Sequence, residues 1–381
     1  MRKENGPSVR IYNLTKELAS LGKKVDVIIP KERDTNETLD GVVVHGVRGL
    51  YSKAMLEVFR RIMGVSRPTA LYFYDLVFVN RISKLIRQVD VVQMEQQTAG
   101  ALLIPFIKRV LKKPVVIDCH DTFQALRVGH TRMLRKMLET FLEKLAYRNA
   151  DLILTVSELE KDSLTSVGIK EKKIEVVPNG VDPGFFKKQP KKTELLKKYS
   201  IEGFQTVVFV GNLEYLPNRE AVEKLSSVIA PKVLSKVRNV KFLVVGKTRG
   251  EFRNSGLIFT GGVKSVPDLL NISDVAIAPL IHGSGTRLKI LEYFSCNLPV
   301  VSTSLGAEGL DVQDGVNIFI ENDMQSFAFR IVKLLRDKNL AATIGEAARK
   351  VVTERYDWKQ IARNLGIVLQ SRFSQTNMGS D

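Results

Sequence analysis

The stretch with the clearest potential for chemistry is a glycine-rich turn that opens a predicted helix and carries two cations. Gly283 and Gly285 precede Thr286, a suitable N-cap, and Arg287 and Lys289 fall in the first helical turn. A helix N-terminus already holds about half a positive elementary charge, so each cation there costs about 0.3–1 kcal/mol. Because the backbone N–H groups of such a turn and both cations can bind one anion, the pattern predicts a diphosphate site.

The same predicted helix contains an acidic residue, Glu292, with apolar residues on nearly all sides. A carboxylate in such surroundings needs a partner, and a sugar hydroxyl of the same ligand could supply it. The alternative is an ion pair between Lys289 and Glu292, which are spaced i,i+3 and would gain about 0.2–0.5 kcal/mol. That pair leaves the two glycines and Arg287 unexplained.

A dinucleotide-binding motif is a second interpretation of this segment. Gly283 and Gly285 have the G-x-G spacing, but Leu288 stands where a third small residue is needed. Glu308, after the next predicted strand, could act as the ribose-binding acid. An NAD-dependent oxidoreductase is therefore an alternative with weak support.

Two further polar residues, His120 and Asp121, follow a predicted strand over 114–120. Ligands of parallel sheets bind beyond the carboxyl ends of strands, so this pair is a candidate for the acceptor side of a site. The structural alternative is a histidine bonded to Asp121. Asn179, in a Pro-Asn-Gly segment, is interpreted as a turn residue. The sequence has no D-x-D triplet, so we expect no metal for the diphosphate.

The composition limits the kinds of partner. The chain has 381 residues, is 44% hydrophobic and carries a formal net charge of +17. Much of the basic excess lies between Arg48 and Arg148, which suits nucleic acid, anionic lipid or a phosphorylated small molecule. No zinc finger, RNP-type motif or basic heptad array is present, so nucleic acid is not expected. Segments 50–62 and 133–147 mix apolar residues with cations, as in a membrane-surface helix or a core-facing one.

The sequence also indicates a cellular location. No apolar stretch approaches the roughly 18–20 residues that span a bilayer, and no apolar signal segment follows Met1. Cys119 and Cys296 lie in apolar patterns and are predicted to be buried thiols, not a disulfide. We therefore expect a cytoplasmic protein, with peripheral attachment to the inner face of the membrane as the alternative.

Short β-branched runs alternate with helical patterns along the whole chain, which is typical of α/β folds with parallel sheets. Strands are predicted at 24–30, 42–47, 89–95, 114–120, 151–157, 174–180, 205–211, 239–246, 256–262, 274–280, 299–303 and 317–320. Two doubly wound domains facing a cleft are expected, over 1–186 and 205–356, with a charged linker over 187–204. The helix over 357–381 is expected to pack back on the first domain.

The beginning of the chain lacks an expected element. A helix capped by Ser8 and ended by Gly22 follows only a short Asn-Gly-Pro turn, whereas a doubly wound domain places a strand first. Losing that strand, which is usually central, would expose the edges of its neighbours. Our hypothesis is that the N-terminal strand is missing because the sequence starts late.

Taken in order, these segments resemble a known family. GSGTRLKILEYFSCNLPVVSTSLGAEGL (283–310) is similar to the donor-binding segment of retaining glycosyltransferase family 4, which has the GT-B fold. The supporting segments are LTVSELEKDSL (154–164), VVPNGVD (176–182), FVGNLEYLPN (209–218) and RYDW (355–358). The similarity runs from about residue 6 to the C-terminus.

The resemblance implies transfer of a sugar from a nucleotide diphosphate donor to a hydroxyl acceptor, with retained configuration and without a metal. A hexosyltransferase acting on a glycan or lipid-linked acceptor is implied, in envelope polysaccharide, glycolipid or glycoprotein glycan assembly. Two alternatives are a sugar-nucleotide epimerase on the same fold and a non-catalytic module that binds nucleotide sugars.

The resemblance also assigns roles to individual residues. Lys289 and Arg287 would hold the diphosphate, and Glu292 would bind the nucleotide ribose. His120 would contact the transferring sugar, with Asp121 orienting it.

The sequence departs from the family pattern at three of the predicted donor-binding positions. Ser284 replaces the first glutamate of the family's E-x7-E pair, and Asn212 and Asn218 stand where many members have Arg and Lys. Charge neutralisation is therefore expected to depend more heavily on Arg287 and Lys289. The donor-binding set predicted here is Asn212, Asn218, Gly283, Ser284, Gly285, Thr286, Glu292 and Glu308.

Overall fold

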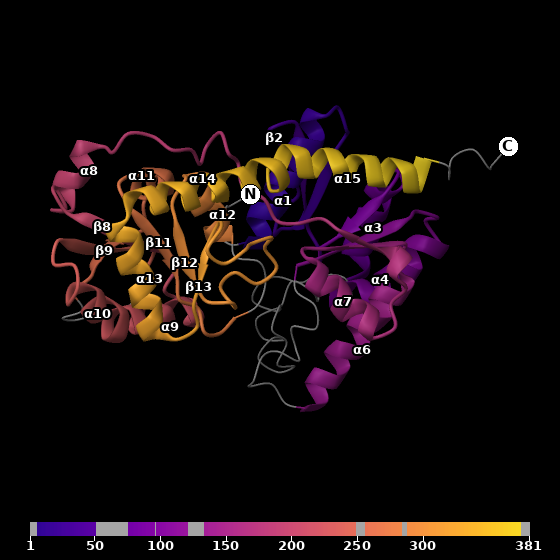
Figure 1. Ribbon diagram of the computed structural model, residues 1–381. Coiled ribbons are helices and arrows are strands. Elements are labelled where there is room, and N and C mark those ends of the chain that lie inside the picture. Colours follow the sequence, from indigo (N-terminus) through magenta and orange to yellow (C-terminus); the bar gives the residue numbers. More distant parts are fainter. Residues whose placement is uncertain are drawn as a thin grey trace. The chain divides into compact units, whose positions relative to one another are not determined.

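The computed structural model describes residues 6–50, 75–95, 97–120, 133–248, 256–283 and 288–374. The chain forms two compact α/β units (Figure 1): unit 1 comprises Met1–Pro178 and Lys359–Asp381, and unit 2 comprises Asn179–Trp358. The boundary falls after Pro178, earlier than the predicted end of the first domain at residue 186. Unit 1 takes the C-terminal residues, so the chain returns to it after completing unit 2.

The segment over 187–204, for which the composition predicts a linker, is instead part of unit 2. It contains a short helix, α8 (Thr193–Lys198), and partly buried Leu196 packs against the core of that unit. The Nζ atom of Lys192 lies 2.8 Å from a carboxylate oxygen of Asp268. The segment is charged, as its composition shows, but its cations form ion pairs on the surface of unit 2 and its leucine packs against the core. The linker prediction is therefore wrong.

Unit 1 contains a four-stranded parallel sheet in the order β4-β5-β6-β7. Its strands are β4 (Val92–Met94), β5 (Val115–Cys119), β6 (Leu152–Thr155) and β7 (Ile174–Val176). Every residue of β5 and β6 is buried, as expected for apolar strands covered on both faces. All four strands lie inside predicted ones.

A separate three-stranded sheet in unit 1 has the order β1-β3-β2. β1 (Asp26–Pro30) and β3 (Val42–Val47) are parallel and lie where strands are predicted. β2 (Thr35–Leu39) pairs antiparallel with β3 and is not predicted, because its residues are polar and mostly exposed. Asp40 and Gly41 connect β2 to β3 with φ of 50° and 79°, the backbone that an Asp-Gly hairpin turn adopts.

The helices of unit 1 are α1 (Gly6–Ser20), α3 (Leu76–Ile86), α4 (Gln97–Arg109), α6 (Met133–Asn149), α7 (Glu158–Ser166) and most of α15 (Trp358–Phe373). A short 3-10 helix, Glu171–Lys173, precedes β7. The side chain of Ser157 caps α7 by accepting a 3.3 Å hydrogen bond from the Glu160 amide, as predicted. Ser8 lies within α1, so the prediction that it caps this helix is wrong; Pro7 suits the first helical turn better.

Unit 2 is built on a six-stranded parallel sheet in the order β10-β9-β8-β11-β12-β13. The strands are β8 (Gln205–Val210), β9 (Val240–Val245), β10 (Ile258–Gly261), β11 (Val275–Ala278), β12 (Val300–Ser302) and β13 (Phe319–Ile320). The helices are α9 (Leu216–Lys224), a π-helical turn (Leu225–Ile229), α10 (Ala230–Leu234), α11 (Val266–Asn271), α12 (Leu288–Ser295), α13 (Met324–Arg336) and α14 (Lys338–Arg355). Each strand lies inside a predicted one.

Alternate residues of the unit 2 strands face two separate cores, as the period of a β-strand requires. Val207 and Phe209 of β8 pack with helices α9, α10 and α13 on one face. Val208 of the same strand packs with α11, α12 and α14 on the other. The sheet is therefore covered by helices on both faces, and its strand ends position the polar residues described below.

Two smaller expectations can be compared with the structure. Cys119 and Cys296 are both buried free thiols, as predicted. Among the residues that the structure describes, no helix combines the length and apolar character needed to cross a membrane.

Candidate functional site

The first polar cluster lies in unit 2, where α12 and α9 meet the carboxyl end of β8; we call it the Lys289 cluster (Lys289, Asn218, Asn212 and Phe209). The Nζ atom of Lys289 donates a 2.8 Å hydrogen bond to Oδ1 of Asn218. It also lies 4.3 Å from the centroid of the Phe209 ring, within cation–π range. Lys289 is thus held at the edge of the sheet where ligands of doubly wound folds bind.

The two asparagines of this cluster have distinct roles. Nδ2 of Asn218 donates to the backbone oxygen of Asn212 over 2.9 Å, which turns its Oδ1 toward Lys289. Oδ1 of Asn212 accepts the amide of Glu214 at 3.0 Å, so this side chain shapes the loop after β8. Both predicted donor-binding asparagines lie here, but the structure gives Asn218 the direct contact with the cation.

Two glycines allow these loops to approach each other closely. A Cβ atom on Gly246, which has a φ of +147°, would lie 2.0 Å from the backbone oxygen of Gly211. A Cβ atom on Gly211 would lie 2.8 Å from the side chain of Asn218. Glycine is required at position 246 because the close atom belongs to the backbone, whereas a Cβ atom at position 211 would displace the side chain of Asn218. The ends of β8 and β9 therefore approach each other this closely only with glycine at position 246.

Helix α12 is fixed to the same strand by its own side chains. The amide of Val210 donates a 2.8 Å hydrogen bond to the hydroxyl oxygen of Tyr293, which is fully buried. Tyr293 is not among the site residues that the sequence predicts. Its neighbour Glu292 is partly buried, and burial raises the pKa of its carboxyl group to about 7, opposed by the charge of Lys289. Near neutral pH this group can therefore either accept or donate a hydrogen bond.

No described residue forms a hydrogen bond or ion pair with the Glu292 carboxyl group. The i,i+3 pair with Lys289, considered as an alternative, is therefore replaced by the Lys289–Asn218 hydrogen bond. The only described charge that acts on Glu292 is that of Lys289. A carboxyl group of raised pKa near a held lysine is a common feature of functional sites.

The turns beside α12 hold the remaining predicted residues that the structure describes. Gly283 has a φ of +111°, a conformation that favours glycine, and follows His282, whose Nδ1 lies 2.8 Å from a carboxylate oxygen of Glu220. Glu308 is partly buried in the turn after β12, and no described contact links its carboxylate to the Lys289 cluster. Ser284, Gly285, Thr286 and Arg287 lie outside the described residues.

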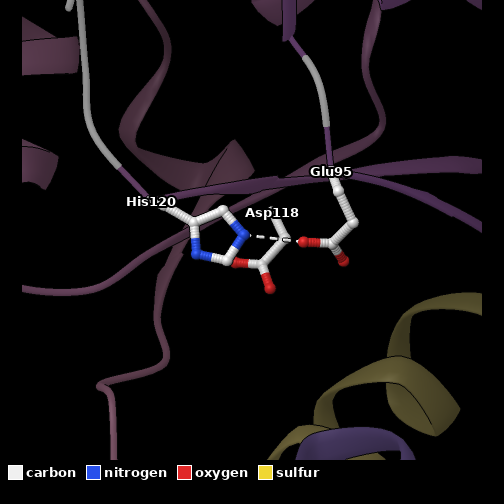
Figure 2. Close-up of side chains that lie close together, drawn as sticks. All are labelled: Glu95, Asp118 and His120. Atoms are coloured by element: carbon white, nitrogen blue, oxygen red, sulfur yellow. Dashed lines mark hydrogen bonds and ion pairs between the residues drawn. The ribbon is translucent and has the colours of Figure 1, made fainter. Parts of the chain in front are cut away.

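The second polar cluster lies in unit 1, at the carboxyl ends of β4 and β5; we call it the His120 cluster (Arg10, Gln93, Glu95, Asp118 and His120). Nε2 of His120 lies 2.7 Å from Oε2 of Glu95. Figure 2 shows the side chains of Glu95, Asp118 and His120 converging on one point. Asp121 lies outside the described residues, and Glu95 is the partner that the structure gives to His120.

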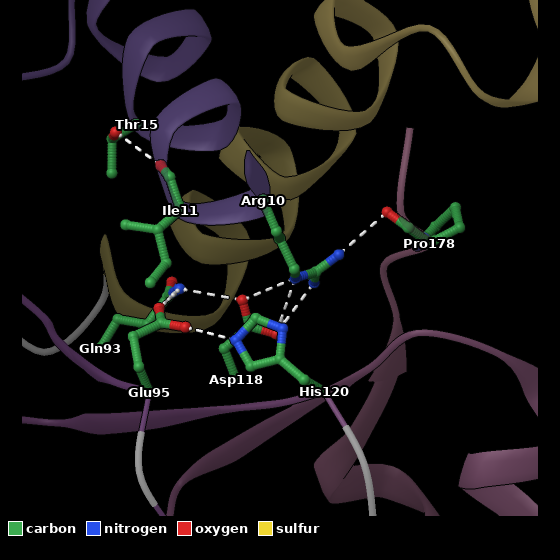
Figure 3. Close-up of polar contacts among 8 residues, drawn as sticks. All are labelled: Arg10, Ile11, Thr15, Gln93, Glu95, Asp118, His120 and Pro178. Atoms are coloured by element: carbon green, nitrogen blue, oxygen red, sulfur yellow. Dashed lines mark hydrogen bonds and ion pairs between the residues drawn. The ribbon is translucent and has the colours of Figure 1, made fainter. Parts of the chain in front are cut away.

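A buried ion pair supports this histidine (Figure 3). Arg10 of α1 and Asp118 of β5 are both 0% exposed, and Nε and Nη2 of Arg10 donate to the two oxygens of Asp118 at 2.9 Å each. Nη1 of Arg10 donates to the backbone oxygen of Pro178 at 3.0 Å. Bidentate geometry and the additional acceptor satisfy the guanidinium, as a buried ion requires.

Gln93 joins the parts of this cluster. Its Nε2 donates to Glu95 at 2.9 Å and to Asp118 at 3.3 Å. Burial lowers the pKa of His120, but the carboxylates of Asp118 and Glu95 raise it more, so the net shift is upward. The cationic imidazolium is therefore favoured, with Arg10 opposing it through its own charge.

The His120 cluster does not fit a metal ion. Single ligand atoms of Glu95, Asp118 and His120 lie within 4.8 Å of one another, which is close enough for shared ligation. However, both oxygens of Asp118 already accept hydrogen bonds from Arg10, so a dication would sit beside a guanidinium. These three side chains instead belong to a network of ion pairs and hydrogen bonds around His120.

The sequence analysis names His120 as a candidate but not the residues that surround it in the structure. The signals were present: Arg10 shares a helix face with buried Leu14 and Glu17, so a cation lies on the inner face of α1. Gln93 and Glu95 are polar residues two positions apart at the carboxyl end of a predicted strand, so they point to the same face. Their partners are distant in sequence, so their pairing could not be derived without the fold.

Comparisons with known proteins agree with this architecture. The family model Glycosyltransferase Family 4 matches residues 4–185, and the model Glycosyl transferases group 1 matches residues 204–337. Together they cover most of both units. The chain therefore belongs to the group 1 glycosyltransferases of the family 4 type, with two Rossmann-like units of the GT-B fold.

Individual proteins show the same likeness. The chain is 24% identical over 290 residues to an uncharacterised glycosyltransferase of Methanocaldococcus jannaschii, covering 71% of this chain and 72% of that one. It is 26% identical over 304 residues to the UDP-Gal:alpha-D-GlcNAc-diphosphoundecaprenol alpha-1,3-galactosyltransferase of Escherichia coli, covering 73% and 75%. The structure of Anabaena HepE in complex with UDP-glucose superposes with a TM-score of 0.72 at 17% identity, covering 97% of each chain.

Proposed function

We propose that this glycosyltransferase moves a hexose from a nucleotide diphosphate donor to a hydroxyl group, with retention of anomeric configuration and without a metal ion. The observation that carries the proposal is the position of Lys289, held by Asn218 and Phe209 at the carboxyl end of β8. The similar Escherichia coli enzyme is named for a UDP-sugar donor, and HepE was crystallised with UDP-glucose.

In the proposed reaction, the acceptor oxygen attacks the anomeric carbon while the bond from that carbon to the diphosphate oxygen breaks. The attack occurs on the face from which the diphosphate leaves, and the acceptor proton passes to the leaving oxygen. Lys289, with Arg287, stabilises the charge that develops on the diphosphate, which is the role a metal plays in other enzymes. Atoms and charge balance without any further reactant.

The remaining site residues complete the donor and sugar contacts in this proposal. Glu292, whose pKa is raised to about 7, binds a hydroxyl of the nucleotide ribose. His120, whose pKa is raised by the carboxylates of Asp118 and Glu95 against the effect of burial, contacts the transferring sugar and donates a hydrogen bond to it. Ser284 and the amides of the adjoining glycine-rich turn take the place of the family's missing carboxylate.

The acceptor that we propose is a lipid-linked glycan in envelope polysaccharide or glycolipid assembly. Met137 and Phe141 of α6 are 61% and 62% exposed and lie one helical turn apart, so two apolar side chains are presented side by side. The chain also carries a net charge of +17, which favours an anionic membrane surface. Flotation with anionic vesicles should recover the protein in a salt-dependent manner, and Met137→Ser with Phe141→Ser should reduce recovery.

The direct test is transfer itself. Incubation of the protein with labelled nucleotide sugars and membrane extract should place the label in an extractable glycolipid or polysaccharide. Lys289→Ala should lower kcat/KM by about 10²-fold or more, because one preorganised donor to a developing charge is worth that much. Conversion of the nucleotide sugar to an isomer would identify an epimerase instead, and retention without turnover a binding module.

A further inference from the structure

Hydrogen bonds join the buried ion pair of unit 1 to His120 through two side chains at the end of β4 (Figure 3). Nε2 of Gln93 donates to Oδ2 of Asp118 at 3.3 Å and to Oε1 of Glu95 at 2.9 Å. The second oxygen of Glu95, Oε2, lies 2.7 Å from Nε2 of His120. Asp118, Gln93, Glu95 and His120 therefore form one series of hydrogen bonds, in which Glu95 uses a separate oxygen for each neighbour.

The direction of these hydrogen bonds follows from the groups involved. An ionised carboxylate only accepts hydrogen bonds, so the amide nitrogen of Gln93 must face Asp118 and Glu95. Glu95 likewise presents an acceptor oxygen to His120, so the ring nitrogen that it contacts, Nε2, carries a proton. Gln93 and Glu95 thereby determine which tautomer the neutral ring adopts.

The other ring nitrogen of His120, Nδ1, is the candidate contact for a ligand. No described residue forms a hydrogen bond with it, and 16% of the side chain is exposed. Because Nε2 holds its proton toward Glu95, Nδ1 of the neutral ring has only a lone pair and accepts a hydrogen bond. The cationic ring carries a second proton, so the same atom then donates. The gain of one proton therefore reverses the polarity of Nδ1.

We propose that Gln93 and Glu95 are positioning residues that fix the tautomer of His120, so that Nδ1 donates to a sugar oxygen only from the cationic ring. That the ligand is a sugar rests on the proposed function, whereas the tautomer does not. A sugar hydroxyl can also donate to Nδ1 of the neutral ring, but the hydrogen bond from an imidazolium is charge-assisted and about twice as strong. Binding of the sugar should therefore weaken as the ring loses its second proton.

The charges around His120 favour the form that donates. Burial acts most strongly and lowers the pKa of His120, but the charge of Asp118 and then the hydrogen bond and charge of Glu95 raise it, and the net shift is upward. Arg10 is the remaining described charge that acts on the ring, and it opposes the cation. Because the pKa is raised, the ring stays cationic to a higher pH than an ordinary histidine and loses its charge as pH rises through that pKa.

A single substitution should reverse the tautomer. In Glu95→Gln, Gln93 still donates to Asp118 and presents its other N–H to residue 95. The new amide must accept that hydrogen bond with its oxygen, so its NH2 group faces Nε2 of His120 and donates to it. The proton of the neutral ring then moves to Nδ1. Glu158→Gln is the matched control, because this glutamate lies on α7 and its side chain is 72% exposed.

Nitrogen-15 NMR of the imidazole rings in the full chain, without substrate, tests the tautomer. Above the pKa of His120, Nε2 should be protonated in the unchanged protein and in Glu158→Gln, whereas Nδ1 should be protonated in Glu95→Gln. Loss of one signal in His120→Asn identifies the ring. The signals of His45 and His282 should stay the same in all variants, which shows that the fold is retained. An unprotonated Nε2 in the unchanged protein, or the same tautomer in Glu95→Gln, would overturn the proposal.

Nucleotide affinities test the contact with the sugar. The affinity for UDP-glucose relative to UDP, or for GDP-mannose relative to GDP, should fall about three- to ten-fold as pH rises through the pKa of His120. This ratio cancels the titration of Glu292, which acts on each sugar nucleotide and its diphosphate alike. Glu95→Gln should flatten the fall, because Nδ1 keeps a proton in both forms of the ring.

The two experiments separate this proposal from the proposed function. If the tautomer is as expected but the ratio of affinities is independent of pH, Nδ1 does not bind the sugar and that part of the proposal is wrong. If neither UDP nor GDP binds, the proposed function loses its support, while the NMR measurement still decides the tautomer.

Discussion

The two units position their polar clusters in different ways. In unit 2, a continuous sheet and two glycine contacts bring together loops that are adjacent along its edge, and Lys289 rests on neighbouring Asn218 and Phe209. In unit 1, the described strands form two separate sheets, and His120 bonds to Glu95 and lies in the field of the buried ion pair between Arg10 and Asp118. The polar side chains of unit 2 are therefore positioned mainly by backbone geometry, whereas those of unit 1 are positioned by ion pairs between residues far apart in the sequence.

The largest effect is expected from breaking the charge network of unit 1. Arg10→Met leaves Asp118 buried without its partner, which should lower the free energy of unfolding by about 3–5 kcal/mol. Chemical denaturation followed by circular dichroism measures the loss. Arg81→Met is the control, because its partner Asp34 is 62% exposed and such surface pairs contribute about 0–1 kcal/mol. Equal losses in the two variants would show that burial of the pair does not matter.

A pH dependence of stability is expected in unit 2. Burial raises the pKa of Glu292 to about 7, so between pH 4.5 and 7 the folded protein binds a proton that the unfolded chain has lost. Stability from this group should therefore fall as pH rises through that window, by at most about 3 kcal/mol. Glu292→Gln should remove the decline. The unfolding free energies of both proteins at pH 5 and pH 8 test this, and identical slopes would contradict it.

The glycine contact of unit 2 should be sensitive to one added methyl group. Gly246→Ala places a Cβ atom 2.0 Å from the Gly211 oxygen, so β8 and β9 must separate at their ends, at a cost of about 1–3 kcal/mol. Gly203→Ala is the control, since its φ of +75° is also left-handed but no atom lies within 4 Å. Thermal unfolding should show a clearly larger loss for Gly246→Ala, and similar losses would indicate that only the backbone angle matters.

The smallest effect is expected on the titration of His120. Removing the charge of Glu95 with Glu95→Gln should lower the pKa of the imidazole, because that carboxylate helps to raise it. Asp118 continues to raise it, so the change is partial. NMR titration of the ring protons measures the shift. An unchanged pKa would mean that Glu95 does not set the charge of this histidine.

Much of unit 2 could be predicted from the sequence because its information is local. Each strand is a β-branched run. Gly283, Lys289 and Glu292 lie within one segment of ten residues, so an anion-binding turn can be predicted there without knowledge of the fold. The contact of Lys289 with Asn218 joins residues far apart in the chain, yet both positions were in the predicted donor-binding set. What was missed, Tyr293, is a buried anchor whose partner is a backbone amide.

Unit 1 was less predictable because its key contacts are long-range. Arg10 and Asp118 are separated by 108 residues, and neither a helical cation nor an acid inside a strand indicates its partner. β2 escaped prediction because a polar edge strand lacks the apolar alternation that marks buried ones. The linker prediction was wrong because it relied on the many charged residues of the segment and gave too little weight to its leucines, which pack against the core of unit 2.

The most direct test of the account is the binding of a nucleoside diphosphate to unit 2. Titration of UDP and GDP into the full chain, read from amide resonances and thermal unfolding, should perturb residues around Lys289 and raise the unfolding temperature. Lys289→Ala should abolish both effects, while Lys241→Ala, which removes a lysine over the Phe204 ring at the other end of the same sheet, should preserve them. If Lys289→Ala bound UDP and GDP as tightly as the unchanged protein, the central claim that Lys289 binds the diphosphate would be contradicted.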